Sequence, residues 1–146
     1  MRNFSKGMLA MLLILTSMTV FAQSTAKKRM FDAIPSAVSL DRNTLSQSFN
    51  YSTGSDVAIA LSPELSFSGT VISNQKKYDN LKTVMIRSAN NMILQITEIT
   101  NTDKSISYVG RIFGSEAADG YEIKNNNGRY SMQKFEASKI FEPCGQ

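Results

Sequence analysis

The chain has 146 residues, a net charge of +4 at pH 7, no histidine, no tryptophan and a single cysteine, Cys144. Without histidine it lacks the base that usually activates a serine or cysteine nucleophile, and it lacks the ligand set of a structural zinc site. The composition therefore argues against the common hydrolase triads, and we expect no cofactor and no metal ion held by the chain itself.

The N-terminal residues have the layout of a secretory signal peptide. Arg2 and Lys6 give a positive start, residues 8–20 form an apolar run, and Val20 and Ala22 supply the small side chains of a cleavage site. The apolar run is too short to span a bilayer, which takes about 20 residues. We expect a protein exported to the periplasm, the cell surface or the outside of the cell, with no transmembrane segment in the mature chain.

The mature chain is long enough for one domain. Removal of residues 1–22, which hold two basic and no acidic residues, lowers the net charge from +4 to +2. The only tight basic run, 27–29, falls in a polar segment, 23–30, that we expect to be flexible, so we expect no nucleic-acid partner. A single β-domain is expected over 31–142, followed by a tail at 143–146.

Residues 41–49 are expected to form a short N-terminal helix. Asp41 can cap its start, and Leu45 and Phe49 can share one face. This helix would cover one end or face of a sheet. The chain continues into an expected strand at 56–61, where apolar and polar residues alternate.

The stretch from residue 65 to residue 113 is expected to form four strands joined by short polar breaks. Asn and Asp in these breaks favour turns, and connections this short join antiparallel neighbours. The expected strands are 65–71, 81–87, 92–98 and 106–112, with a loop at 74–80. The strand at 81–87 carries apolar residues toward both faces, which is typical of an inner strand covered on two sides.

A β-hairpin is expected at the end of the domain, where an Asn-Gly pair at residues 127 and 128 separates two alternating runs. The runs are 121–124 and 129–134, and 139–141 is a candidate for one more strand. Seven or eight strands with one short N-terminal helix predict a mainly β fold of the α+β type, built on an antiparallel meander.

Two glycines, Gly69 and Gly110, fall inside expected strands. Glycine at such positions marks a bend or a close approach of two backbones. The bends favour a coiled sheet or a small barrel, and a barrel of this size is filled by its own side chains.

The candidate binding residues are aromatic and basic. Tyr78 lies with Lys76 and Lys77 in the predicted polar loop, where an exposed aromatic side chain is a candidate for docking on a partner. The other strand tyrosines are in phase with apolar neighbours, which predicts packing in the core.

Acidic residues offer one catalytic alternative, a small hydrolase that uses carboxylates near Asp119 and Glu122. The acids considered are Glu64, Glu98, Glu116, Asp119 and Glu122. Each is expected in or beside a turn or at a strand end, where a solvated charge is usual. We therefore expect no enzyme.

Cys144 has three interpretations: an intermolecular disulfide, an incidental remnant, or a ligand for a partner's zinc ion. Pro143-Cys144-Gly145 resembles the centre of the cysteine switch of metalloprotease propeptides, in which a thiolate occupies the catalytic zinc. The resemblance implies a metalloprotease as partner. The first interpretation implies an envelope-associated structural protein that forms a disulfide-linked homodimer.

Three further segments carry a second resemblance. Gly69 to Val71, Lys77 to Val84 and Tyr108 to Ile112 are similar to segments in a group of short exported bacterial β-domain proteins. This resemblance implies export and a β fold. The sequence as a whole predicts a non-catalytic module that binds another exported protein, with a protease inhibitor or propeptide-like protein as the narrower form.

Overall fold

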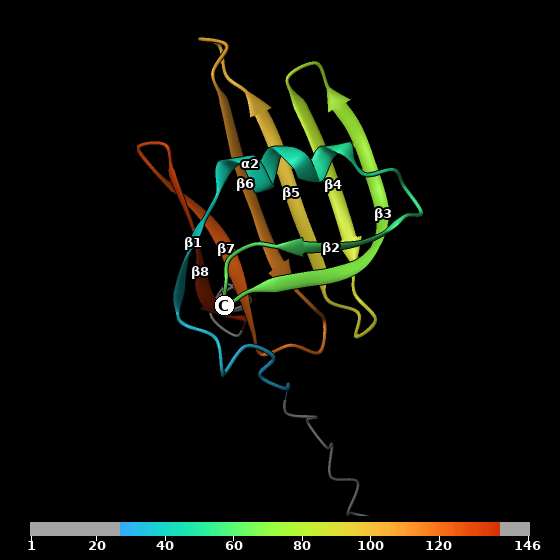
Figure 1. Cartoon of the computed structure of the whole chain (residues 1–146), viewed down its shortest axis with the longest axis vertical. Helices are drawn as coiled ribbons and strands as arrows, with labels where there is room; N and C mark the ends of the chain where they lie inside the picture. The colour runs from blue at the N-terminus through green and yellow to red at the C-terminus, as the bar shows by residue number, and fades with distance from the viewer. Residues whose placement is uncertain (1–26, 138–146) are drawn as a thin grey trace, which may run out of the picture.

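The computed structural model describes residues 27–137, which form one sheet of eight antiparallel strands and a short helix (Figure 1). The predicted mainly β fold is confirmed. The predicted signal peptide, the candidate strand at 139–141 and the tail with Cys144 lie outside the described residues. The proposed division of the chain at residues 22, 30 and 142 stays a prediction.

The elements follow one another as a meander after the first strand. Their bounds are β1 Ala37–Leu40, α2 Arg42–Gln47 continued by the 3-10 turn η2 Ser48–Asn50, β2 Asp56–Ala60, β3 Ser66–Tyr78, β4 Leu81–Arg87, β5 Ile93–Thr100, β6 Ile106–Phe113, β7 Asp119–Asn126 and β8 Arg129–Glu136. The strand order across the sheet is β1-β8-β7-β6-β5-β4-β3-β2.

The sheet is curled into a half-barrel, and α2 lies across its concave side in front of β4, β5 and β6 (Figure 1). Gly69 and Gly110 lie at close backbone approaches between neighbouring strands, one of the expected reasons for glycine in a strand. A Cβ atom at Gly69 would lie 2.2 Å from the Arg87 carbonyl oxygen, and one at Gly110 would lie 2.3 Å from that of Gln95. Only glycine allows these close backbone approaches. The sheet is open between β1 and β2, so it is coiled without closing into a full barrel.

The helix forms as the sequence predicts. The Asp41 side chain accepts the backbone N–H of Asn43 at 3.0 Å and so caps the first turn. Leu45 and Phe49 are buried against the sheet. The side chains of Asn74 and Lys82 both donate to the Phe49 carbonyl oxygen, at 2.9 and 3.2 Å. The helix thus covers the concave face, and two inward-facing strand residues hold its end.

The predicted loop at 74–80 is wrong, because β3 continues to Tyr78 and only Asp79 and Asn80 form the turn. Asn74 looked like a turn residue in the sequence. In the structure its amide nitrogen donates to the carbonyl oxygens of Phe49 and Tyr51, which keeps it in the strand. These partners lie more than 20 residues away in the chain, so the local composition gave no sign of them.

The strand β1 was not predicted. Val38 and Leu40 alternate with exposed neighbours and are buried, and β1 pairs antiparallel with β8. The hairpin between β7 and β8 is confirmed, because Asn127 and Gly128 both have positive φ, at 52° and 84°, as a type I′ turn requires.

The strand tyrosines pack in the core as predicted. Tyr108, Tyr121 and Tyr130 are buried, and the rings of Tyr108 and Tyr130 meet edge to face at 5.8 Å between centroids. The concave interior is therefore filled by side chains and by α2.

Candidate functional site

The outward side of the three central strands is unusually apolar. The strands β4, β5 and β6 pair in a regular register, and their inward residues, such as Val84, Leu94 and Ile112, are fully buried. Because side chains alternate along a strand, the residues between them face outward.

These outward residues form a surface of four rows across three strands, which we call the outer array. Its rows are Leu81, Ile99 and Ser107; Thr83, Thr97 and Val109; Met85, Gln95 and Arg111; and Arg87, Ile93 and Phe113. Six of the twelve residues are large and apolar, two are arginines and none is acidic. Thr83 and Thr97 share a hydrogen bond of 2.9 Å at its centre, and Thr97 is buried by its neighbours.

An antiparallel sheet with one solvated face normally carries polar residues on that face. The intrinsic preference of β-branched and aromatic residues for strands explains an isolated valine or isoleucine. It does not explain Leu81 and Met85 on β4. The sequence indicated that 81–87 is covered on both sides. In the structure one side packs against the core, and no element between residues 27 and 137 covers the other.

The structure separates the three binding residues predicted near the β3–β4 turn. Tyr78 pairs with Leu81 and therefore extends the first row of the outer array, with 62% of its surface exposed. Lys76 pairs with Lys82, whose ammonium group lies 5.3 Å from the centre of the Phe49 ring on the concave side. Lys76 also forms an exposed ion pair with Asp79 at 2.9 Å. Lys77 is exposed and lies between Lys76 and Tyr78, where the register of the β3–β4 pairing shifts. Their role in binding stays a prediction.

A pocket of about 600 Å³ opens at the lower end of the outer array, beyond the third and fourth rows. Gln95, Arg111 and Phe113 of the array line one wall, and Phe135 lines another. The loop between β6 and β7 and the residues Lys27 and Ala137 complete it. The pocket exists because β6 and β7 pair at only two positions before they separate. The sequence showed no signal for it, since its walls come from four separate segments.

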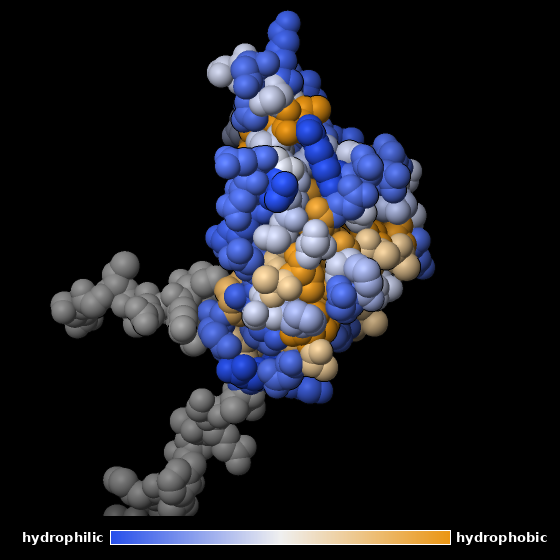
Figure 2. All heavy atoms as spheres, turned by 60° about the vertical axis from the view of Figure 1, so that its left-hand side comes forward, coloured by the Kyte–Doolittle hydropathy of each residue, from blue (hydrophilic) through white to orange (hydrophobic). Residues whose placement is uncertain are grey.

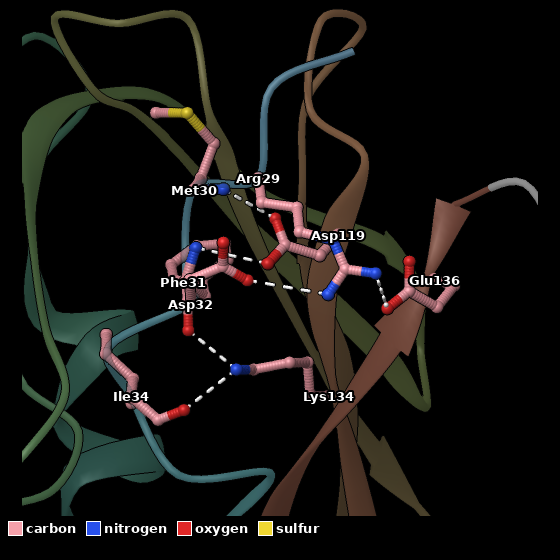
Figure 3. Close-up of polar contacts among 8 residues, drawn as sticks. All are labelled: Arg29, Met30, Phe31, Asp32, Ile34, Asp119, Lys134 and Glu136. Atoms are coloured by element: carbon pink, nitrogen blue, oxygen red, sulfur yellow. Dashed lines mark hydrogen bonds and ion pairs between the residues drawn. The ribbon is translucent and has the colours of Figure 1, made fainter. Parts of the chain in front are cut away.

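The segment before β1 is held by a polar cluster that includes Asp119, a residue of the pocket wall (Figure 3). Both carboxylate oxygens of Asp119 accept backbone N–H groups, from Met30 at 2.7 Å and from Phe31 at 3.1 Å. The Lys134 ammonium group donates to the carbonyl oxygens of Phe31 and Ile34 at 2.6 and 2.8 Å. Arg29 pairs with Asp32 at 3.4 Å and with Glu136 at 3.0 Å.

The cluster also fixes residues that the sequence assigned to a flexible segment. The Lys28 N–H donates to the Glu116 carbonyl oxygen at 3.1 Å, and the Ala118 N–H donates to that of Lys28 at 2.9 Å. Residues 28–31 are thus bound to the start of β7 and the loop before it.

The expectation that Asp119 is a solvated charge is wrong, because its exposed fraction is 1%. A signal was available: Asp119 is in phase with Tyr121 and Ile123, which are buried on the same face. Glu122 lies three positions further, on the opposite face of the strand, where its carboxylate accepts the Lys124 ammonium group at 2.6 Å. These two acids therefore do not converge as a catalytic pair.

The remaining acids do not converge either. Glu64 and Glu116 are exposed, and Glu98 accepts the Tyr108 hydroxyl at 3.2 Å. Burial and the negative charge of Glu98 raise the pKa of the Tyr108 hydroxyl above its usual value. Within residues 27–137 no three His, Cys, Asp or Glu side chains are grouped as a metal site.

Apolar side chains reach the surface outside the outer array as well. Figure 2 turns the left-hand side of Figure 1 forward and shows a broken band of hydrophobic residues between hydrophilic ones. Among the large apolar residues, Tyr78, Val109 and Ile106 are the exposed ones in the described part of the chain, and Val109 and Ile106 expose 47% and 38% of their surfaces. Single exposed apolar residues are common, so the array is distinguished by its continuity.

The fold and the site together define a half-barrel of antiparallel strands with an apolar convex face. Searches of family models, of curated proteins and of solved structures found nothing that matches the chain. No helix in the described part of the chain is long and apolar enough to cross a bilayer.

Proposed function

We propose that the protein is an exported, non-catalytic binding module that docks on another protein through the outer array. The observation that supports this most strongly is the set of six large apolar side chains facing outward from β4, β5 and β6. Contiguous exposed apolar surface is typical of protein interaction sites.

The energetics favour a partner with an apolar centre. Full burial of one side chain such as leucine or isoleucine contributes about 1.5–3 kcal/mol. The residues of the array are half-buried already, so each gains only part of that amount, and several must act together. Tyr78 at the upper margin of the array adds an aromatic side chain of the kind that often dominates binding energy.

The charges of the array indicate the chemistry of the partner. Arg87 and Arg111 are exposed, and the array contains no acidic residue to neutralise them. A partner surface with acidic side chains around its apolar centre would complement these arginines and gain in association rate and specificity.

The narrower form of the proposal is a protease inhibitor in which the Cys144 thiolate binds the zinc ion of an exported metalloprotease. Its support comes from the sequence Pro143-Cys144-Gly145 and from the open coordination position of catalytic zinc. Cys144→Ala should abolish inhibition if the thiolate is the ligand. Unchanged inhibition by this variant would contradict the thiolate mechanism and leave docking through the outer array standing.

The test of docking uses two glutamate variants on one strand. Val109 lies in the outer array, and Ile106, three positions earlier, lies on the other face of β6 with a similar exposure. The secreted protein is used to isolate a partner from the exported fraction of its host. The partner is then identified, purified and titrated with the wild type, Val109→Glu and Ile106→Glu.

We expect Val109→Glu to weaken the affinity 10-fold or more, because it buries a carboxylate in an apolar contact at a cost of about 1–3 kcal/mol or more. Ile106→Glu should stay within about 3-fold of the wild type. Equal affinities of the two variants would contradict docking through the array, and so would the lack of any saturable partner.

A further inference from the structure

We propose that the pocket below the outer array binds a fatty acid, with its carboxylate on Arg111 and its hydrocarbon chain against the two phenylalanine rings. The pocket volume of about 600 Å³ falls in the range of about 300–1,000 Å³ that is usual for small-molecule sites. This proposal is independent of protein docking, although the site shares three residues with the array.

The charge at one wall selects an anionic ligand. Arg111 is exposed, and its side chain has no hydrogen bond or ion pair with any described residue. Its neighbour in register on β7 is Glu122, whose carboxylate is occupied by Lys124 at 2.6 Å. A guanidinium group without a protein partner presents paired N–H donors, and their geometry matches the two oxygens of a carboxylate.

The second carboxylate near the pocket does not neutralise Arg111. Asp119 lines the pocket floor, but its two oxygens accept the N–H groups of Met30 and Phe31. A ligand carboxylate can therefore pair with the Arg111 guanidinium group, which no described acidic side chain engages.

The other walls select a hydrocarbon chain. Phe113 and Phe135 line the pocket with Ala117 and Ala137. The Phe135 ring lies against Gly120, where a Cβ atom would come within 2.6 Å of the ring. The missing side chain at residue 120 lets the ring lie close to β7. Apolar walls beside the Arg111 guanidinium group fit a single-chain amphiphile better than a polar metabolite.

The test follows decanoate binding to the full-length secreted protein by NMR, below the micelle concentration of the ligand. The amides of Gly114 and Ala117 report on the pocket, and that of Gly128 in the distant β7–β8 hairpin serves as a reference. The variants are Arg111→Gln, Ser115→Trp at the pocket rim, and Arg129→Gln as a matched loss of an exposed arginine elsewhere. Decyltrimethylammonium has the same chain length with the opposite charge.

We expect saturable shifts of the pocket amides with decanoate and much weaker ones with decyltrimethylammonium. Arg111→Gln should weaken decanoate binding about 10-fold or more, since it removes a charge-assisted hydrogen-bond pair. Ser115→Trp should weaken it by filling the rim, and Arg129→Gln should leave it unchanged. A variant is folded if the chemical shifts of its amides away from the pocket match those of the wild type.

Three results would overturn the assignment: no saturable shift with the wild type, equal binding of the two amphiphiles, or equal effects of Arg111→Gln and Arg129→Gln. None of them bears on the docking variants Val109→Glu and Ile106→Glu, so failure of the pocket and failure of the outer array are separate outcomes.

Discussion

The carboxylate of Asp119 accepts the backbone N–H of Phe31 at 3.1 Å, although 88 residues separate the two in the chain. The neighbouring N–H of Met30 binds the other oxygen at 2.7 Å. A buried charge with two such donors is satisfied, whereas a buried charge without them is costly. This contact fastens the segment before β1 to the start of β7 at Asp119, which also lines the pocket.

Asp119→Asn should lower the free energy of unfolding by about 2–3 kcal/mol. The amide retains one acceptor oxygen, but its NH₂ group faces a backbone N–H, so one buried donor loses its partner. Glu122→Gln is the matched control on the same strand, where the carboxylate is half-exposed and its ion pair contributes about 0–1 kcal/mol. Urea unfolding of the three proteins checks this, and equal midpoints for both variants would contradict the structural role of Asp119.

Gly69→Ala should destabilise the fold strongly, by about 3 kcal/mol or more, because the new Cβ would lie 2.2 Å from the Arg87 carbonyl oxygen. Gly69 pairs with Val57 of β2, and the next residue, Thr70, pairs with Arg87 of β4, so the close approach lies where β3 contacts both neighbours. Ser68→Ala, at the exposed neighbouring position, should change stability by less than about 0.5 kcal/mol. Thermal unfolding of both variants measures the difference. Similar melting temperatures would show that the two backbones do not approach so closely.

Stability should fall at alkaline pH through two core tyrosines. Burial, with a smaller effect of Glu98, raises the pKa of Tyr108, and burial with a smaller effect of Asp119 raises the pKa of Tyr121. Both values lie above the usual pKa of about 10. The neutral phenols therefore make their full contribution to the free energy of unfolding below pH 10. This contribution is lost as the pH rises through the pKa values of the two tyrosines in the folded state.

The variant Tyr121→Phe separates this effect from general alkaline denaturation. It removes the ionisable group together with the hydrogen bond from its hydroxyl to the Pro35 carbonyl oxygen. It should be less stable than the wild type at pH 7, and the gap should narrow above pH 10. Urea midpoints between pH 7 and pH 12 measure both quantities, and a constant gap across this range would contradict the raised pKa.

The parts of the fold that depend on neighbouring residues could be predicted from the sequence. The cap at Asp41 involves Asn43, two residues away, and the type I′ turn involves only residues 126–129. The strands of the meander also follow from local alternation. Each of these features is decided by residues within one turn or one strand.

The features that the sequence did not predict are made by distant partners. Asn74 stays in β3 through carbonyl groups of the helix region, and β1 joins β8 at the far end of the chain. The pair Asp119-Gly120 resembles a turn in the sequence. In the structure the backbone N–H groups of residues 30 and 31 donate hydrogen bonds to the Asp119 carboxylate. The pocket is hidden for the same reason, because four separate segments line it.

The outer array is an intermediate case. The outward Leu81 and Met85 were visible in the sequence as apolar residues on the second face of a strand, which indicated cover on both sides. The sequence did not show that neighbouring strands continue this surface, because the register of β4, β5 and β6 sets which residues are adjacent. Within residues 27–137 only the inward face of β4 packs against the core, so the expected cover on its outward face stays a prediction.

The most direct test of docking through the outer array is photo-crosslinking from residue 109 in the protein as its native host makes it. A photoreactive phenylalanine analogue replaces Val109 in one protein and Ile106 in a second, and the adducts are identified by mass spectrometry. Docking through the array predicts one abundant adduct with another protein from residue 109 and little or none from residue 106. Equal yields from both positions, or no adduct from residue 109, would contradict it.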